Sequence, residues 1–346
     1  MGLFSETKRS LGLDVGTASV KLVQLAMEGG RLKLETYGEV WVMPRGSGTG
    51  ASNFSLPNEE IGAIVSELVK ATKAKPTNVT AAIPIFSSFV TIFELPALSE
   101  TELADAIPYQ ARKYVPVPIE DVTLDWSIAS RGKRGENQSE VLEILLVAIP
   151  NEVIARYLKI AQIAGLDLKA LESESFAVAR GLTGGDKNPL CLIDIGASST
   201  DITIVDEGTV RVSHNFDIGG HRFNNVVAST PQAEATQRGQ NIKPAGIGKI
   251  PPAALPLIDT IVNEINRFVT DYTTKTNRKI TKIILSGGKA QMPGLSDYFV
   301  QKFAIPVLFA NPFGNLIYPS VLDKKLKSLG PSYAVAVGAA MRHFSS

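Results

Sequence analysis

Residues 11–23 read LGLDVGTASVKLV, and residues 191–203 read CLIDIGASSTDIT. In each copy an apolar stretch leads into Asp-x-Gly, then a few small polar residues, then a second apolar stretch. This is the pattern of a β-hairpin with a glycine-containing turn. A hairpin repeated about half a chain away predicts two related halves. Three pairs of residues coincide in the repeat: Asp14 with Asp194, Gly16 with Gly196, and Ser19 with Ser199.

Outward from the two hairpins, strand and helix patterns alternate along the chain. NVTAAIP at 78–84 and KIILSGG at 282–288 predict buried strands. The helical spacing of apolar residues over 257–272 predicts an amphipathic helix. PSYAVAVGAAM at 331–341 begins with proline and is rich in alanine and glycine, which predicts a closely packed helix. This alternation indicates an α/β fold.

Residues 97–167 show a self-contained order of helix, strand, polar tip, strand and helix. Ser99 and Glu102 have capping-box spacing, and Pro108 is expected to kink or break the helix that they start. RGKRGENQS at 131–139 is expected to be the tip of a hairpin. The domain prediction is 1–96 for the first part of a first domain, 97–167 for an inserted α+β subdomain, 168–182 for a connecting helix, 183–330 for a second domain, and 331–346 for a closing helix that returns to the first domain.

Length and composition suit a globular protein of about two domains. The chain has 346 residues, of which 44% are hydrophobic and 20% charged, and its net charge of +1 argues against a nucleic-acid partner. A single cysteine, Cys191, excludes a disulfide framework, and three histidines make a zinc cluster unexpected. A reducing compartment is therefore expected.

Direct membrane insertion is not expected from the sequence. The N-terminal MGLFSETKRS lacks the apolar core of a signal peptide, and Glu6 departs from the myristoylation pattern. Apolar runs such as LLVAIP at 145–150 are far too short to cross a bilayer. A role at a membrane would therefore need a partner.

The repeated hairpins supply what a nucleotide held between two domains would need. Phosphates need backbone N–H groups at close range, and small residues in tight turns provide them. Asp14 and Asp194 are placed to offer Mg²⁺ hard oxygen ligands. Lys21 can reach a phosphate as a point charge, and Asp201 takes the equivalent place in the second copy. The predicted ligands are thus ATP (or ADP) and Mg²⁺, and the turn residues are Gly16, Thr17, Ala18 and Ser19 in one half and Gly196, Ala197, Ser198 and Ser199 in the other.

Two Gly-Gly pairs are expected to complete this site. In LSGGKAQMPGL at 285–295, Gly287 and Gly288 precede Lys289 and would let the backbone approach an adenosine. In NFDIGGHRFNNVV at 215–227, Gly219 and Gly220 precede a helix whose N-terminus would face the nucleotide.

The order of these motifs resembles the actin, sugar kinase and heat-shock chaperone superfamily, which has a ribonuclease H-like fold of two domains. More narrowly, the chain resembles the PilM family of type IV pilus assembly proteins, and 97–167 resembles the subdomain of the FtsA and PilM type. The segments that carry the narrower resemblance are MGLF at the start, LDVGTASVKLVQL, ARKYVPVPIEDV at 111–122, AGLDLKALESESFAVARGL at 164–182 and LSGGKAQMPGL.

The resemblance implies a cytoplasmic ATP-binding adaptor with at most slow ATPase activity. It would dock the cytoplasmic N-terminal tail of a bitopic inner-membrane protein like PilN beside the inserted subdomain, and so lie at the inner membrane through partners. Pilus motor or platform proteins and self-association are further implied contacts. In this superfamily a water-positioning side chain starts the connecting helix, the place of Glu174, although a carboxylate there also suits the helix dipole. Glu234 matches an acidic position near the ribose, and Gln237 stands where a lysine is usual.

Other classes of protein remain compatible with parts of the sequence. An FtsA-like division protein usually carries an amphipathic C-terminal helix, whereas this chain ends in MRHFSS. The inserted stretch argues against MreB, another filament-forming ATPase. A small-molecule kinase would need a general base for which no distinctive aspartate loop is found. Pro116 and Pro118 predict an extended apolar edge at 114–119 for a peptide, or else a simple connector.

Overall fold

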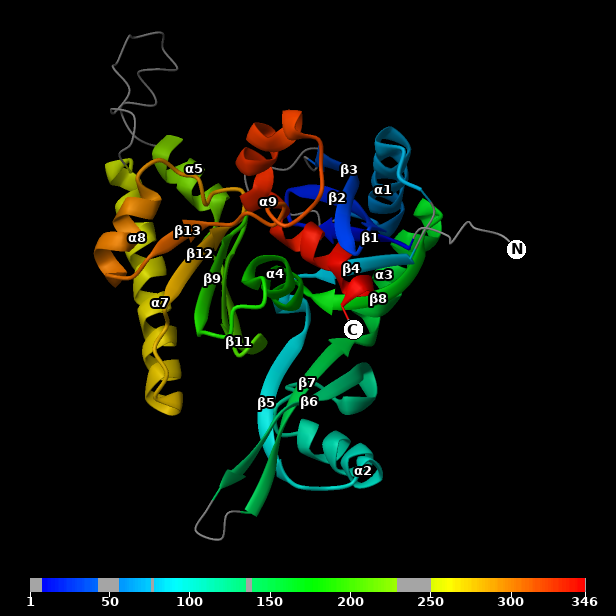
Figure 1. The fold of residues 1–346 in the computed structure, drawn as a ribbon, viewed down its shortest axis with the longest axis vertical. Coiled ribbons are helices and arrows are strands. Elements are labelled where there is room, and N and C mark those ends of the chain that lie inside the picture. Colours follow the sequence, from blue (N-terminus) through cyan, green and yellow to red (C-terminus); the bar gives the residue numbers. More distant parts are fainter. Residues whose placement is uncertain (1–7, 43–55, 76–77, 135–138, 229–249, 346) are drawn as a thin grey trace.

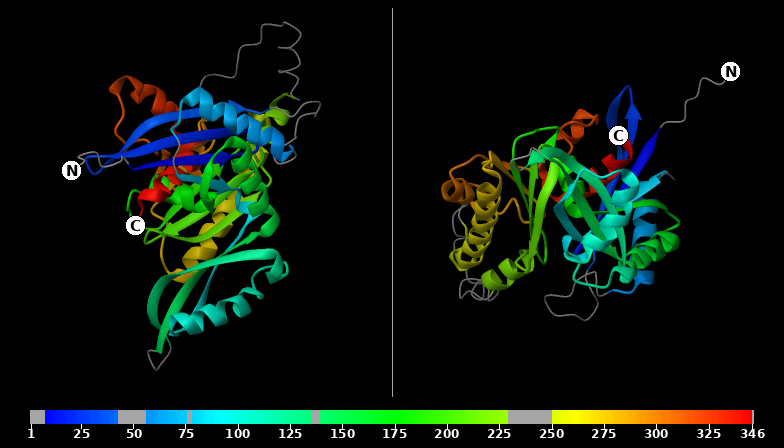
Figure 2. Two further views of the ribbon diagram at one scale, coloured as in Figure 1. Left: turned by 90° about the vertical axis from the view of Figure 1, so that its right-hand side faces the viewer. Right: turned by 90° about the horizontal axis from the view of Figure 1, so that it is seen from below.

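The structure is a computed structural model that describes residues 8–42, 56–75, 78–134, 139–228 and 250–345. Two lobes lie side by side, and a smaller third unit projects below them (Figure 1). The side views show the same projection (Figure 2). Glu234 and Gln237 lie outside the described residues.

The first lobe is built on a five-stranded sheet in the order β3-β2-β1-β4-β8. The first three strands are antiparallel, and β4 and β8 run parallel to β1. Helices α1 (Asn58–Thr72) and α3 (Asn151–Ala164) pack on one face of this sheet. The strands are β1 (Arg9–Val15), β2 (Ser19–Glu28), β3 (Arg31–Trp41), β4 (Asn78–Ile83) and β8 (Asp167–Ser173).

The second lobe repeats this arrangement in the order β11-β10-β9-β12-β13, with the same strand directions. Helices α7 (Leu255–Thr276) and α8 (Leu295–Phe303) pack against it, and α5 (Gly220–Ala228) follows β11. The duplication predicted from the two hairpins is therefore a duplication of whole sheets. The strands are β9 (Leu190–Ile195), β10 (Thr200–Asp206), β11 (Thr209–Phe216), β12 (Lys282–Ser286) and β13 (Val307–Phe309).

Helices α4 (Glu174–Thr183) and α9 (Asp323–Met341) lie between the two sheets (Figure 1). They cross so closely that a Cβ atom on Gly338 would stand 1.8 Å from the carbonyl oxygen of Ala177. Both helices differ in extent from the sequence prediction. Residues 167–173 form strand β8, so the connecting helix begins only at Glu174. The closing helix begins at Asp323, and Pro331 lies inside it.

The third unit is a three-stranded antiparallel sheet in the order β5-β7-β6. Its strands are β5 (Phe89–Pro96), β6 (Val122–Arg134) and β7 (Ser139–Pro150), and α2 (Glu100–Ala111) covers one face. The predicted capping box of Ser99 and Glu102 is confirmed. Pro108, predicted to kink or break this helix, does not break it, because α2 continues through it to Ala111.

Packing suggests bounds for this unit that differ from 97–167. Strand β5 pairs with β7 and so belongs to the third sheet. Helix α3 instead contributes Tyr157 and Ile160 to the core of the first lobe. We therefore propose that the inserted subdomain comprises residues 89–150.

The segment predicted as an extended edge at 114–119 is a connector. Residues 112–118 form turns and bends between α2 and β6. Val115 is buried, and the ring of Tyr114 stacks on Phe93 at 5.2 Å between ring centroids. The free edges of the third sheet are therefore β5 and β6, since β7 lies between them.

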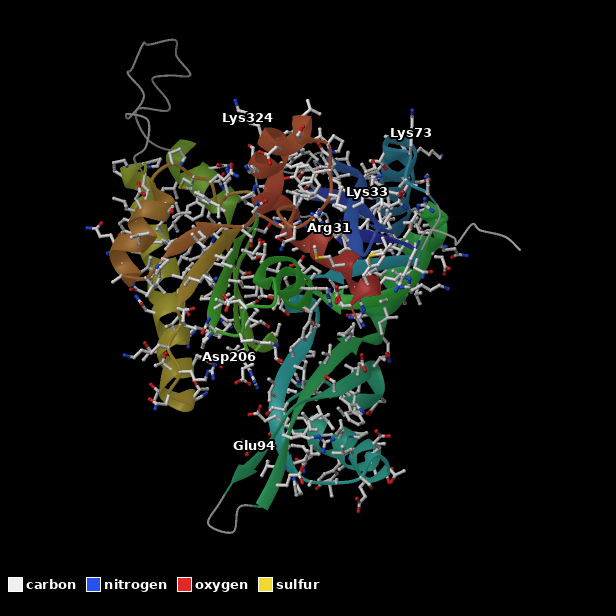
Figure 3. The ribbon with its side chains drawn as sticks, viewed as in Figure 1. Arg31, Lys33, Lys73, Glu94, Asp206 and Lys324 are labelled. Atoms are coloured by element: carbon white, nitrogen blue, oxygen red, sulfur yellow. The ribbon has the colours of Figure 1, made fainter. Side chains whose placement is uncertain are left out.

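The subdomain also touches the second lobe. Arg211 Nη1 on β11 donates to Glu143 Oε2 on β7 at 2.7 Å, and Ser130 Oγ donates to the same oxygen at 2.5 Å. Figure 3 labels Asp206, at the end of β10 in the second lobe, and Glu94, on strand β5 of the subdomain. Across the described ranges, none of the helices is both long and apolar enough to cross a bilayer.

Candidate functional site

A cavity of about 430 Å³ opens between the two lobes, where the turns of both hairpins meet. Most residues predicted for the site line it. Ser198 and Gly219 are not among the lining residues and pack against each other, since a Cβ on Gly219 would stand 2.5 Å from the carbonyl carbon of Ser198. The predicted residues that line the cavity are Asp14, Gly16, Thr17, Ala18, Ser19, Lys21, Glu174, Asp194, Gly196, Ala197, Ser199, Gly220, Gly287, Gly288 and Lys289.

The two hairpin turns have the same geometry. The N–H of Gly16 donates to the carbonyl of Ser19 at 3.0 Å, and the N–H of Gly196 donates to that of Ser199 at 2.9 Å. A side chain at Gly196 would crowd this carbonyl, at 3.2 Å from a built Cβ. Glycine therefore lets each turn close tightly at the end of its strand.

On the first lobe, Asp14 and Lys21 face each other across the hairpin. They are register partners, with Lys21 Nζ 3.5 Å from Asp14 Oδ2. Lys21 Nζ also lies 3.8 Å from Glu39 Oε1 on β3. Burial raises the pKa of Asp14 in spite of Lys21. Burial opposes a charged Lys21, but the charges of Asp14, Glu39 and Asp194 together raise its pKa.

On the second lobe, Asp194 and Asp201 take the same two register positions. Burial raises the pKa of Asp194 to about 6, although Ser286 Oγ donates to its carboxylate at 2.8 Å. Burial and the charge of Asp194 raise the pKa of Asp201 to about 7, against a hydrogen bond from Asn215 Nδ2 at 2.5 Å. The position that Lys21 holds in the first lobe is thus occupied by the carboxyl group of Asp201 in the second.

Glu174 adds a further carboxyl group from the first turn of α4. Burial raises its pKa well above the usual value, and the charges of Asp201, Asp14 and Asp194 raise it further while Lys21 opposes them. Buried carboxylates that repel one another favour either a proton or a bound cation.

These residues suit a magnesium ion that keeps part of its water shell. The described ranges hold no group of three or more His, Cys, Asp or Glu side chains arranged to enclose a metal. Asp14 and Asp194 instead approach from opposite lobes beside the glycine turns. Mg²⁺ is commonly held by one or two carboxylates together with waters and phosphate oxygens. The site is therefore suited to Mg²⁺ that is already bound to a phosphate group.

Several lining residues had no signal in the sequence. Trp41 and Phe86 stand at the rim on the first lobe, with 66% and 53% of their surface exposed. His221 and Asn224 come from α5, and α9 contributes Ser332. Glu39 could have been found, because it pairs in register with Lys21 one strand away.

Two sheets of identical topology, the pair of helices between them and the inserted third sheet define the class: this is a two-domain actin-like α/β protein. Residues 12–344 match the family described as type IV pilus assembly protein PilM, and the chain belongs to that family.

Solved structures share the fold. A PilM–PilN type IV pilus biogenesis complex superposes with a TM-score of 0.80 at 20% identity, covering 97% of this chain and 99% of that one. MreB5 of Spiroplasma citri bound to AMPPNP gives 0.51 at 14% identity, covering 99% and 97%. EutJ of Carboxydothermus hydrogenoformans gives 0.51 at 16% identity, covering 98% and 90%.

Curated relatives match over part of their length. Cell division protein FtsA of Pseudomonas aeruginosa is 25% identical over 194 residues, which are 48% of this chain and 46% of that protein. Ethanolamine utilization protein EutJ of Salmonella typhimurium is 27% identical over 149 residues, 42% of this chain and 49% of that protein. The matched regions thus span about half of each relative.

Proposed function

We propose that this chain is a nucleotide-binding adaptor of type IV pilus assembly, which holds ATP or ADP with Mg²⁺ between its lobes and docks the tail of a PilN-like inner-membrane protein. The observation that carries the nucleotide part is the convergence on one cavity of two equivalent hairpin turns and four carboxyl groups whose pKa values are raised by burial. The family membership and the actin-like fold support it.

Each part of the cavity has a proposed role. The turns at 16–19 and 196–199 offer backbone N–H groups to phosphates, with Lys21 adding its charge. Asp14 and Asp194 hold Mg²⁺ through oxygen atoms and waters. Gly287, Gly288 and Lys289 approach the nucleoside side, and Gly219 and Gly220 let the N-terminus of α5 face the nucleotide. Glu234 near the ribose and Gln237 stay predictions.

Hydrolysis is proposed to be slow. The bound magnesium nucleotide would supply a phosphoryl group open to attack by water, and Glu174 is the proposed water-positioning residue. Its carboxyl pKa is raised well above the usual value by burial and by neighbouring carboxylates. A raised pKa favours the protonated carboxyl group, which can orient water but accepts a proton from it poorly.

Substituting alanine for Asp14 or Asp194 is expected to weaken magnesium-dependent ATP binding at least tenfold, which is about 1.4 kcal/mol. Each change removes one of the two carboxylates that approach from opposite lobes. Calorimetric titration with ATP, in magnesium and in EDTA, measures the effect. Asp125→Ala, an exposed carboxylate on the subdomain, is the control. Wild-type affinity in both variants would contradict the shared site.

The tail is proposed to bind between the subdomain and the first lobe. Strands β6 and β8 are both edge strands, each with one unpaired side. A groove of about 290 Å³ is lined by residues of both. The apolar residues that line it are Trp126, Leu145, Val147, Ile149, Leu171 and Phe176. An extended apolar peptide can add to such an edge through its backbone and place alternate side chains on the apolar strip.

Substituting arginine for Ser127 is expected to weaken binding of a synthetic PilN-like tail at least tenfold. Ser127 is exposed on β6 and lines the groove, so the long charged side chain fills it without disturbing the core. The matched control is Thr91→Arg, which places the same side chain in the other groove of the subdomain, beside the second lobe. Fluorescence anisotropy of the labelled peptide measures both. Equal losses in the two variants, or none in Ser127→Arg, would place the tail elsewhere.

The proposed location at the inner membrane and the further partners depend on nucleotide binding and on docking of the tail. Docking of a membrane-anchored tail would hold the protein at the inner membrane. Contacts with pilus motor or platform proteins, and self-association, stay predictions.

A further inference from the structure

His221 lies where the start of α5 meets the second hairpin turn, on the side of the cavity formed by the second lobe. It is the second residue of α5, and its backbone N–H donates to the carbonyl of Ala197 at 2.7 Å. The preceding N–H, of Gly220, donates to the carbonyl of Gly196 at 2.9 Å. The first turn of α5 is therefore bound directly to the second hairpin turn, and the imidazole lines the cavity beside it.

The Nε2 atom of His221 is buried and has no hydrogen-bond partner within the described part of the protein. A buried polar atom without a hydrogen-bond partner is destabilising, so it calls for an explanation. The other two histidines differ. His343 Nε2 lies 3.2 Å from Asn78 Nδ2, and the ring of His214 stacks on Phe268 at 4.8 Å between ring centroids.

The surroundings of His221 are already engaged. Asn224, one turn further along α5, accepts a hydrogen bond from Lys289 Nζ at 3.0 Å. The stem of Lys289 packs on Gly220, where a Cβ would meet it at 2.7 Å. His221 as a residue lines the cavity, so a ligand held there is the partner that we consider for Nε2.

We propose that His221 is a nucleotide-contacting residue whose Nε2–H donates a hydrogen bond to a phosphate oxygen. This rests on the proposed nucleotide site. A phosphate is chosen over the nucleoside because His221 is held against Ala197, in the turn proposed to bind phosphates. Imidazole can present Nε2 as a donor in its neutral form or when protonated. An anionic acceptor strengthens such a hydrogen bond.

The test compares Mg-ADP with adenosine by calorimetry on the whole chain. His221→Ala is expected to weaken ADP binding about fivefold and to leave adenosine affinity unchanged. His221→Gln, whose side-chain amide keeps a donor at the ε position, is expected to stay within about twofold of wild type. His343→Ala is the control and should match wild type for both ligands.

Nitrogen-15 spectra of the imidazoles give an independent readout, because the chain has only three histidines. Mg-ADP is expected to shift the His221 Nε2 resonance and not that of His343. Unchanged ADP affinity in His221→Ala, or an equal loss for adenosine, would overturn the phosphate contact while leaving the nucleotide site in place. If the wild-type chain binds no ADP, the proposed nucleotide function itself fails, and this inference fails with it.

Discussion

Substituting valine for Gly338 is expected to lower the free energy of unfolding by more than about 3 kcal/mol, a large fraction of the total stability of a typical protein. Gly338 lies where α9 crosses α4. A Cβ atom there would stand 1.8 Å from the carbonyl oxygen and 2.5 Å from the carbonyl carbon of Ala177. Both are backbone atoms, so no side-chain rotation can make room. The two helices would have to separate, and with them the lobes that form the cavity.

Urea denaturation followed by circular dichroism measures the loss. Gly338→Ala should already show a large part of it, because the first added carbon makes the contact. The control is Gly132→Ala on β6, where a Cβ would meet no atom within 4 Å. Similar stability of Gly338→Val and wild type would mean that the α4–α9 crossing is looser than the structure shows.

Substituting asparagine for Asp201 is expected to stabilise the ligand-free protein at pH 8 by roughly 2–4 kcal/mol. Burial and the charge of Asp194 raise the pKa of Asp201 from 3.8 to about 7 in the folded protein. Each pKa unit between the folded and unfolded states corresponds to about 1.4 kcal/mol. Asparagine removes the buried charge and keeps an oxygen that can accept from Asn215 Nδ2.

The raised pKa of Asp201 also makes the free energy of unfolding of the wild-type protein depend on pH. Between about pH 4 and pH 7 the folded protein holds a proton that the unfolded chain has released. Its free energy of unfolding therefore falls as the pH rises through this range and levels off above it. Asp194, with a pKa of about 6, adds to the fall in the same direction.

Urea midpoints measured from pH 4 to pH 8 test this prediction. The stabilisation by Asp201→Asn should be largest at pH 8 and should shrink steadily towards pH 4, because the aspartate is protonated in both states only below its unfolded pKa of 3.8. Asp125→Asn, at an exposed position on β6, should follow wild type throughout. A variant that is no more stable than wild type at pH 8 would show that the carboxylates of the cavity do not repel one another as the structure indicates.

Much of the fold follows from local features of the sequence. The turn at Gly16 and its copy at Gly196 are specified by residues a few positions apart, because a hairpin forms between neighbouring segments. Its register then places Lys21 opposite Asp14, and Asp201 opposite Asp194. The capping box at Ser99 is local in the same sense. The repeat of one hairpin predicted the two-lobed architecture.

Elements that depend on distant partners were predicted less well. Residues 167–173 become strand β8 because they pair with β4, which lies far away in the sequence. Pro331 suggested a helix start, yet α9 begins at Asp323 and passes through it between the two sheets. Strand β5 joins the subdomain by pairing with β7, across about fifty residues.

The chemistry of the site was decided by tertiary structure. Sequence patterns predicted Asp14, Asp194 and Glu174 as residues of the site. Their pKa values are raised because folding buries these carboxyl groups, which come from separate segments, close to one another. His221 follows the Gly-Gly pair at 219–220 but was not predicted as a site residue, and its proposed role depends on a ring nitrogen that packing leaves without a partner among the described residues. The sequence alone thus determined the two hairpins and the residue types of the site, whereas burial and charge proximity between distant segments, which act through space, decided how those residues behave.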